Sequence, residues 1–289
     1  MYNSEQEYLA NYNEDAYRHP SVTVDMLIFA INRQKNKNYR ALCKKSLQVL
    51  LIKRRDYPSK DKWAVPGGFV EMDESLYEAA CRELKEETSL ENVYMEQLYT
   101  WGDVNRDPRT RVISVSYMAI ANKSDLSPKA NDDAAEAEWF DIQYYKSSDD
   151  EEGNTYILSL SGENGTTLKA KIKEVCIEHG NVLHKSYEIV DSGEIAFDHA
   201  KILAYSLERL KAKVEWSDIA FHLMPREFTL GDLQDVYSII LGKTFQATNF
   251  RRKIKHMIIP LGKKSSDSFG HRPSELYSFN KDWFLTKNY

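Results

Sequence analysis

The sequence has few cysteines, no long hydrophobic run and nothing typical of a secretory signal. Its three cysteines, Cys43, Cys81 and Cys176, are odd in number and far apart, which argues against a disulfide framework or a structural zinc site. No stretch approaches the roughly 18 apolar residues that cross a bilayer. The first 20 residues have neither the basic nor the apolar region of a signal peptide. We therefore expect a cytoplasmic protein with reduced thiols and no membrane partner.

What the chain does contain indicates a globular protein long enough for two domains. Hydrophobic residues make up 42% of its 289 residues and charged residues 29%, a balance typical of folded chains. The net charge of −5 is unevenly divided. Residues 211–289 contain 13 Lys and Arg against 8 Asp and Glu, a net charge of +5, so residues 1–210 carry −10. This division favours an acidic, metal-using front and a basic back that could bind a polyanion.

The front of the chain alternates strand-like and helix-like segments. After a polar leader over residues 1–20, we expect a mixed α/β unit over residues 21–143. The basic stretch 33–45 is interpreted as a solvated loop inside this unit. The expected strands are Val22–Ile31, Leu47–Arg54, 63–71, 93–103, Val112–Ala121 and Ala135–Ile142.

Residues 144–195 interrupt this rhythm. The turn residues of "SGENGTT" and the period-two alternation of "LKAKIK" indicate an inserted β-hairpin or a small sheet. Apolar residues then recur at helical spacing, which predicts a connecting helix over residues 196–212. Residues 213–289 are expected to form a separate C-terminal domain.

Residues 67–90, "GGFVEMDESLYEAACRELKEETSL", concentrate carboxylates on one loop and one helix. We expect the helix to begin near Asp73 or Glu74 and to end near Thr88. Gly67 and Gly68 permit a tight turn in which the backbone comes close to a ligand. Because like charges three or four residues apart destabilise a helix, this density of carboxylates requires a compensating interaction.

A divalent cation is the obvious candidate for that interaction. Glu83 and Glu87 share one helix face and Glu86 lies beside them. Three such carboxylates form a hard oxygen site suited to Mg²⁺ or Mn²⁺. Arg82 is placed to orient a neighbouring glutamate. An ordinary salt-bridged helix is the alternative interpretation.

The same stretch resembles the Nudix box, which is defined by a glycine, a glutamate and an Arg-Glu-rich helix at fixed spacing. The matching positions are Gly68, Glu74, Arg82, Glu83, Leu84, Glu86, Glu87 and Leu90. The final glycine of the box is Ser89 instead, so the turn that ends the helix is expected to be altered.

The resemblance to Nudix hydrolases implies an α/β/α sandwich over residues 21–143 and metal-dependent cleavage of a diphosphate linkage. It implies that Glu83, Glu86 and Glu87 bind the metal, that Arg82 positions a glutamate and that Glu74 supports the loop. The catalytic base is left unassigned.

A second stretch, "YTWGDVNRDPRTRVISVSY", is similar to the corresponding part of ADP-ribose-binding Nudix proteins and of the NrtR group of Nudix-related regulators. Arg106 and Arg109 could hold a pyrophosphate through paired hydrogen bonds. Arg54 and Arg55 are further candidate phosphate contacts, beside Gly67 and Gly68. The alternative is an Asp–Arg network that fixes a surface loop.

The C-terminal segment predicts a winged helix-turn-helix. A helix over residues 228–245, a second over 246–257 with four basic residues and no acidic one, and a basic β-hairpin follow the order of that motif. The segment is also similar to the C-terminal domain of NrtR-type regulators, although a basic solvated surface is the alternative. The residues expected to bind double-stranded DNA are Asn249, Arg251, Arg252, Lys255, Lys263, Lys264 and Arg272.

Two functions follow from this resemblance. The first is a Mg²⁺-dependent hydrolase that cleaves the pyrophosphate of ADP-ribose or a related nucleoside diphosphate sugar, with AMP and ribose 5-phosphate as the products from ADP-ribose. This hydrolase would also bind DNA and would form a homodimer. The second is a non-hydrolysing regulator that senses ADP-ribose or a sugar phosphate. In a third possibility, the winged helix serves only dimerisation or closure of the substrate site.

Overall fold

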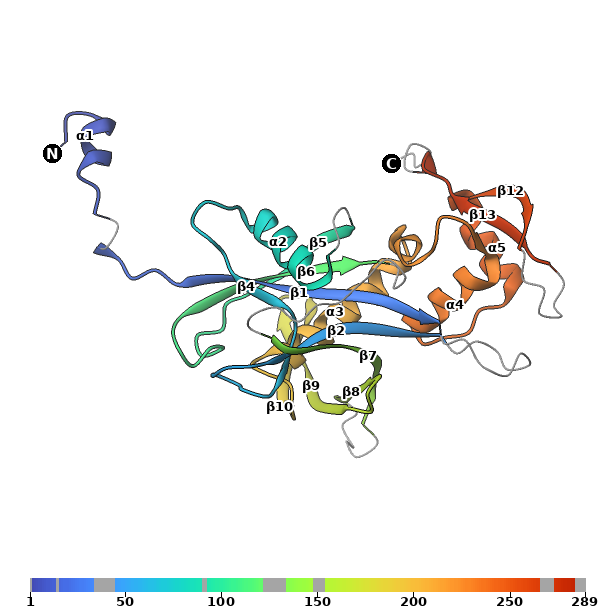
Figure 1. Cartoon of the computed structure of the whole chain (residues 1–289), viewed down its shortest axis with the longest axis horizontal. Coiled ribbons are helices and arrows are strands. Elements are labelled where there is room, and N and C mark those ends of the chain that lie inside the picture. Colours follow the sequence, from blue (N-terminus) through green and yellow to red (C-terminus); the bar gives the residue numbers. More distant parts are fainter. Residues whose placement is uncertain are drawn as a thin grey trace.

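The computed structural model describes residues 2–13, 16–33, 45–89, 93–121, 134–147, 154–265 and 273–283. Most of their strands belong to one large twisted sheet (Figure 1), in the order β10-β9-β8-β7-β2-β1-β6-β5, with β3 beside β2 and β4 beside β1. The strand bounds are β1 Ser21–Arg33, β2 Lys45–Arg54, β3 Trp63–Ala64, β4 Gly67–Phe69, β5 Tyr94–Trp101, β6 Val112–Ile120, β7 Ala134–Lys146, β8 Thr155–Gly162, β9 Thr167–His179 and β10 Val182–Asp191.

Strand β1 lies in the middle of the sheet, and both of its faces are buried. Burial on both faces explains its nearly continuous apolar sequence. It pairs parallel with β6 and antiparallel with β2. Met26 and Ile28 pack on the face covered by helix α2 (Leu76–Thr88). Leu27 and Phe29 pack on the opposite face, in the cluster that includes helix α3 (His199–Val214). The predicted α/β/α sandwich is therefore confirmed.

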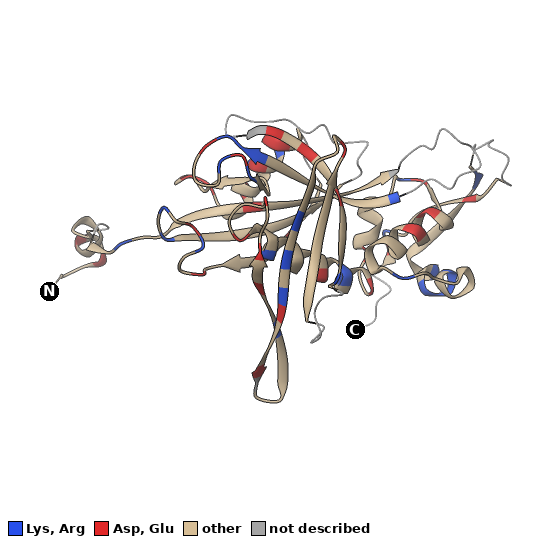
Figure 2. Ribbon diagram, turned by 90° about the horizontal axis from the view of Figure 1, so that it is seen from below, with Lys and Arg blue, Asp and Glu red and all other residues tan. Residues whose placement is uncertain are grey.

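The β-rich segment continues the large sheet. Strand β7 extends to Lys146 and pairs with β8 from Phe140 to its end, and β9 and β10 follow in antiparallel order. The segment expected as an inserted hairpin or small sheet thus extends the main sheet, because β7 is long enough to offer a full edge to β8. Strands β9 and β10 form a long hairpin that projects from the body (Figure 2).

Helix α2 begins at Leu76, two or three residues later than expected. Ser75 is its N-cap and forms a capping box with Glu78: the Ser75 hydroxyl accepts from the Glu78 N–H, and the Glu78 carboxylate accepts from the Ser75 N–H. At the other end, Ser89 has φ 59° and ψ 18°, the left-handed conformation in which glycine is usual. The serine therefore keeps the turn that a glycine would make.

The C-terminal domain is a winged helix, as the sequence predicts. Its elements are η3 (Ile219–Leu223), β11 (Phe228–Thr229), α4 (Leu230–Leu241), α5 (Ala247–Ile254), η4 (Lys255–Met257), β12 (Ile258–Lys264) and β13 (Glu275–Phe279). The three strands form a small sheet in the order β11-β13-β12. The second helix is shorter than expected, because its last turn is the 3₁₀ helix η4.

The two domains share one continuous hydrophobic core. The cluster that contains Phe29 of β1 runs through Leu207 and Leu210 of α3 to Tyr237 of α4 and Phe250 of α5. An ion-paired contact reinforces the junction. Lys45 Nζ, at the start of β2, lies 2.7 Å from Asp232 and 2.7 Å from Asp235, both on α4.

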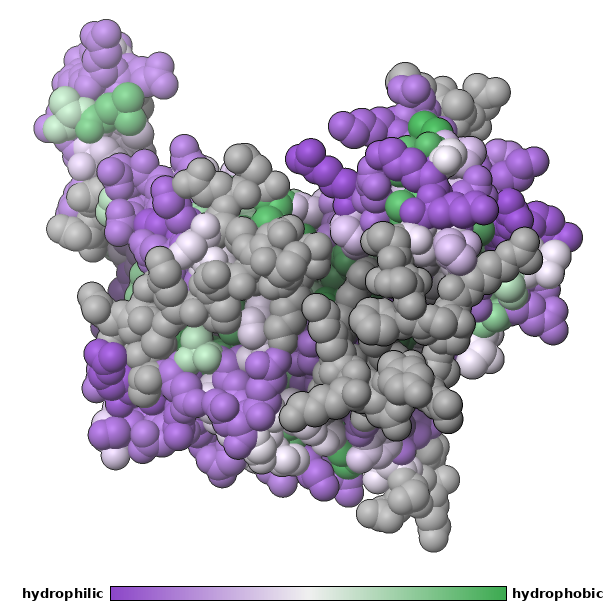
Figure 3. Space-filling model, turned by 45° about the vertical axis from the view of Figure 1, so that its right-hand side comes forward, coloured by the Kyte–Doolittle hydropathy of each residue, from purple (hydrophilic) through white to green (hydrophobic). Residues whose placement is uncertain are grey.

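The N-terminal arm contrasts with this packing. Helix α1 (Glu5–Ala10) has no buried residue and stands away from the sheet (Figure 1). Figure 3 shows hydrophobic surface on the arm. Leu9 of α1 is 62% exposed. Among the described helices, none is both long and apolar enough to cross a membrane.

Candidate functional site

Helix α2 places the glutamates of the box unequally. Glu83 and Glu87 lie one turn apart on the face that packs against the sheet, and both are buried. The side chain of Glu86 is 46% exposed. The shared face of Glu83 and Glu87 follows from their spacing of four residues, whereas Glu86 lies at the edge of that face.

Arg82 is the centre of an ion-paired cluster beside this face. Its guanidinium contacts Glu74 at 2.7 Å and Glu83 at 2.7 Å, and it donates to the carbonyl oxygen of Phe69 at 3.1 Å. Glu86 Oε2 lies 3.6 Å from the same guanidinium. Arg82 therefore holds the loop that precedes α2 as well as one of the box glutamates.

The pKa values of the two glutamates paired with Arg82 are shifted in opposite directions. Burial raises the pKa of Glu83, although the hydrogen bond from Arg82 opposes this. The hydrogen bond from Arg82, followed by that from the Glu71 N–H, lowers the pKa of Glu74. A divalent cation near Glu83 would favour its charged form, as Arg82 does, so this buried carboxylate is suited to a cation.

The donor set of α2 fits Mg²⁺ or Mn²⁺ by its chemistry, because all three candidate ligands are carboxylates. Within the part of the chain that the structure describes, however, no three His, Cys, Asp or Glu side chains converge as a metal site. Glu83 is turned to Arg82 instead. Binding an ion with all three glutamates would therefore require their side chains to rotate from this arrangement.

Gly67 and Gly68 bring the loop close to its neighbours. A Cβ atom on Gly68 would lie 2.2 Å from Glu83 Oε1, so the glycine leaves the space that this carboxylate occupies. A Cβ atom on Gly67 would lie 2.1 Å from the carbonyl oxygen of Val24 in β1. Close approach to the backbone of β1 therefore requires glycine at position 67, whereas Gly68 leaves room for the side chain of Glu83.

Replacing Gly67 with alanine is expected to lower the free energy of unfolding by about 2 kcal/mol, because the added Cβ would have to displace the backbone of β1. Denaturant unfolding would measure the loss. The control is Gly165→Ala in the β8–β9 turn, where a Cβ would meet nothing within 4 Å; it is expected to cost about 1 kcal/mol. Equal losses in both variants would contradict the assigned role of the close approach.

A cleft opens beside this loop, between the sheet and the start of α3. Among the residues that line it are Asp25, Arg54, Gly68, Arg106, Arg109 and His199. It thus combines residues from β1, β2, the loop after β5 and α3. The arginines and aspartates that line it offer donors for phosphate oxygens and acceptors for hydroxyl groups.

The arginines predicted as phosphate contacts differ in their exposure and in their position relative to the cleft. Arg109 is 43% exposed and pairs with Asp107 at 2.8 Å. Arg54 lines the cleft with its guanidinium 5.0 Å from the ring centre of Phe197. Arg55 follows β2 on the exposed surface and is not one of the residues that line this cleft within the described chain.

Arg106 also lines the cleft, but its side chain is only 6% exposed. It makes two hydrogen bonds to Asp198, Nε to Oδ2 at 2.9 Å and Nη2 to Oδ1 at 2.8 Å. The same Nη2 lies 3.5 Å from Asp25 Oδ2. In this structure Arg106 therefore belongs to a buried network, which resembles the Asp–Arg alternative more than an open phosphate contact.

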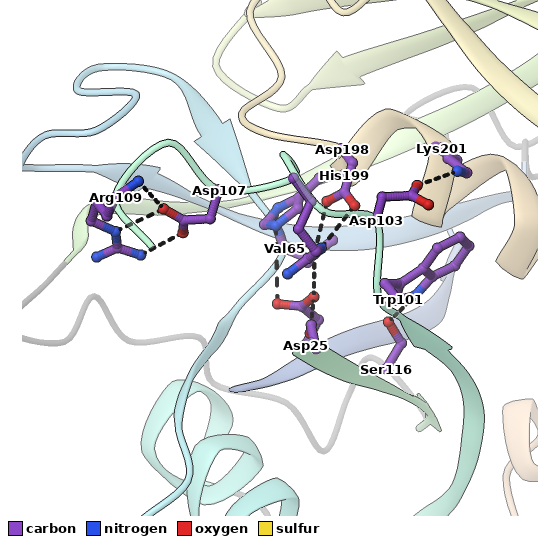
Figure 4. A network of polar contacts seen from close by, with 12 residues as sticks. Asp25, Val65, Trp101, Asp103, Asp107, Arg109, Ser116, Asp198, His199 and Lys201 are labelled. Atoms are coloured by element: carbon purple, nitrogen blue, oxygen red, sulfur yellow. Dashed lines mark hydrogen bonds and ion pairs between the residues drawn. The ribbon is translucent and has the colours of Figure 1, made fainter. Parts of the chain in front are cut away.

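Three residues of this network were not identified from the sequence: Asp25, Asp198 and His199 (Figure 4). The Val65 N–H donates to His199 Nδ1 at 3.0 Å. Burial lowers the pKa of His199, so the ring is neutral and carries its proton on Nε2, 4.0 Å from Asp25 Oδ1. The one available sequence signal was Asp25, a lone charge inside the apolar run "VTVDMLIFAI".

The winged helix presents basic residues on α5. Phe250 and Ile254 are buried against the domain core, and Arg251 and Arg252 are exposed. Arg252 contacts Asn249 at 3.4 Å, on the same outer surface. Figure 2 shows Lys and Arg on the helix at this end of the molecule, with Asp and Glu on the neighbouring helix.

The remaining candidate DNA contacts are distributed around the second helix and the wing. Lys255 follows α5 and is exposed, and Lys264 ends β12. Lys263 is engaged by Glu227 at 3.0 Å. Arg272 lies outside the described residues.

Comparisons with known proteins match both halves of the chain. Residues 39–159 match the family described as NUDIX domain, and residues 220–279 match the NrtR DNA-binding winged helix domain. The chain is 31% identical over 280 residues to the ADPR responsive transcriptional repressor NtrR of Acinetobacter baylyi, which covers 96% of this chain and 89% of that protein.

Two further proteins match one or both halves. The ADP-ribose pyrophosphatase of Methanocaldococcus jannaschii is 40% identical over 126 residues, which are 44% of this chain and 64% of that protein. The crystal structure of Shewanella oneidensis NrtR complexed with a 27mer DNA superimposes with a TM-score of 0.58 and 25% identity, covering 91% of this chain and 94% of that one.

Proposed function

Because the chain belongs to the NrtR family, in which a Nudix domain precedes a winged helix domain, we propose that it is a DNA-binding regulator whose Nudix domain binds ADP-ribose or a related nucleoside diphosphate sugar. The observation that carries this proposal is the position of the cleft. Its wall includes His199, in the first turn of α3, and the far end of α3 is packed into the core of the winged helix.

The chemistry of the cleft suits such a ligand. Arg54 and Arg109 offer guanidinium groups to a diphosphate. Asp25 offers a carboxylate to ribose hydroxyl groups, and the neutral His199 offers an N–H donor. An anionic ligand with several hydroxyl groups would use both kinds of side chain.

The exposed basic face of α5 supports DNA binding. In a winged helix the second helix of the motif enters the major groove, where Arg251 and Arg252 would contact phosphates or guanine edges. A homodimer would present two such helices to two half-sites one helical turn apart.

ADP-ribose is expected to bind and to change the affinity of the protein for DNA by about tenfold, a typical coupling between two sites. The ligand would be titrated by calorimetry. DNA affinity would be measured with a duplex selected by the protein from a random pool, with and without saturating ADP-ribose. AMP and ribose 5-phosphate, each half of the ligand, are the controls. An absence of ADP-ribose binding would contradict the proposal.

Hydrolysis of the bound ligand is a second candidate function, favoured by the complete acidic set on α2. Glu83, Glu86 and Glu87 would hold Mg²⁺, and Arg82 would position Glu83 while Glu74 holds Arg82 in place. When bound, the ion would neutralise charge on the diphosphate and activate water. The left-handed Ser89 preserves the helix end on which this arrangement depends. Both functions can reside in one protein.

A further inference from the structure

Asp198 occupies an unusual position at the start of α3. It is the N-cap residue of the helix, where an aspartate side chain ordinarily accepts a hydrogen bond from the first turn. Here the side chain makes no such bond. Its carboxylate is directed away from the helix to Arg106, at 2.8 and 2.9 Å. The helix therefore begins without a side-chain cap, because the side chain of its N-cap residue is paired with Arg106.

The residue before Asp198 is also held in an unfavourable conformation. Phe197 has φ 51°, in the left-handed region that costs a non-glycine residue free energy. It lines the cleft, and the guanidinium of Arg54 lies over its ring. Strain of this kind persists only where the surrounding contacts impose it. The Arg106–Asp198 pair, only one residue away, is such a contact.

Helix α3 connects this point to the DNA-binding domain. Its 16 residues span about 24 Å at the usual rise per residue. Leu207, Leu210 and Val214 at its far end lie in the shared core, and the helix packs against both η3 and α4. A change in the position of its first turn would therefore act on the elements that carry α5.

The carboxylate of Asp198 has two chemically reasonable partners. One is the guanidinium of Arg106, as observed, and the other is the set of N–H groups at the start of its own helix. Building on the proposed binding of a nucleoside diphosphate sugar, we propose that Asp198 is a positioning residue that exchanges between these partners. When the ligand engages Arg106, Asp198 turns to cap α3, and the first turn of α3 moves relative to the cleft.

This exchange also relieves an electrostatic conflict. With Arg106 paired to Asp198 and next to Asp25, the buried cluster holds two carboxylates and one guanidinium. The neutral His199 adds no charge. An anionic ligand would be repelled by the excess carboxylate. When the Asp198 side chain turns from Arg106 to the N–H groups of α3, the negative charge beside the ligand falls. Ligand binding and the movement of Asp198 therefore favour each other.

The Asp198→Asn variant distinguishes the two interactions of residue 198, the ion pair with Arg106 and the cap of α3. Asparagine is as good an N-cap as aspartate but cannot form an ion pair with Arg106. We expect this variant to bind ADP-ribose within about threefold of the wild-type affinity. Its DNA affinity should be the same with and without ADP-ribose, whereas the wild type should change by about tenfold. Calorimetry and DNA titration of the full chain measure the two quantities.

The matched control is Asp103→Asn. Asp103 pairs with Lys201 at 2.8 Å and joins the same loop to the same helix, but its side chain is 68% exposed. This variant should keep the tenfold response. Hydrogen exchange adds a direct measurement: ADP-ribose should slow exchange in the first turn of α3 in the wild type, and in Asp198→Asn the exchange should already be slow.

The possible outcomes are distinct. A wild-type response in Asp198→Asn, or equal losses in both variants, would overturn the role of Asp198. A wild type that binds ADP-ribose without any change in DNA affinity would overturn it as well. A wild type that does not bind ADP-ribose would instead refute the proposed function. If Asp198→Asn fails to fold, Asp198→Ser, which also caps a helix without charge, answers the same question.

Discussion

Replacing Glu83 with glutamine is expected to reduce Mg²⁺-dependent hydrolysis of ADP-ribose by about a thousandfold, the scale of losing a group that stabilises charge in a transition state. Glu83 is a buried carboxylate that faces Gly68 and is paired with Arg82. The amide has the same shape but no charge to hold a cation. The rate of hydrolysis would be measured as release of AMP, with Mg²⁺ and with EDTA. The variant should still bind ADP-ribose.

The matched control for this change lies on the same helix. Glu78 is exposed and belongs to the capping box of Ser75, a position where glutamine serves as well as glutamate. Glu78→Gln should therefore keep both fold and turnover. Normal turnover in Glu83→Gln would remove this residue from the metal site. A wild type without turnover would remove hydrolysis altogether and leave ligand binding as the role of the Nudix domain.

The double change Arg251→Ala and Arg252→Ala is expected to weaken DNA binding by about a hundredfold, since each arginine contact contributes on the order of 1–3 kcal/mol. Both side chains are exposed on α5, while Phe250 and Ile254 hold the helix from its other face. The logarithm of the affinity should also fall less steeply with the logarithm of salt concentration, by about two units of slope. Titrations at several salt concentrations measure both quantities.

Lys243→Ala provides the control for a simple loss of positive charge. Lys243 belongs to the same domain but pairs with Glu215 at 2.7 Å, after the end of α4. Its removal should change DNA affinity by less than about threefold, within the range of an exposed ion pair. If both variants weaken binding equally, the effect is one of overall charge and α5 is not the recognition helix.

Local patterns made much of the fold predictable. The continuous apolar run of β1 predicts a strand buried on both faces, and the apolar stripe of α2 follows from the period of 3.6 residues. The start of α2 was misplaced because Asp73 and Ser75 are both suitable N-caps and Glu74 is favourable in a first turn. The structure selects Ser75, since Glu74 is used by Arg82 and by the Glu71 N–H.

Partners distant in sequence could not be predicted. Arg106 has the appearance of a phosphate contact when only its neighbours are considered, but its main partner is Asp198, 92 residues later. Periodicity carries no information about such a pair, because it depends on how the sheet and α3 come together. The spacing of the box likewise placed Glu83 and Glu87 on one face without indicating that Arg82 would engage Glu83.

The core that runs from β1 through α3 to α5 has a consequence for how the molecule loses its structure. A boundary between the proposed ligand site and the proposed DNA-binding surface passes through the middle of one packed interior. Because this interior is shared, we expect the two halves to unfold as one cooperative unit, even though we propose a separate task for each. A destabilising substitution deep in the Nudix sheet is therefore expected to lower the amount of folded winged helix, even though it lies far from the proposed DNA-binding surface.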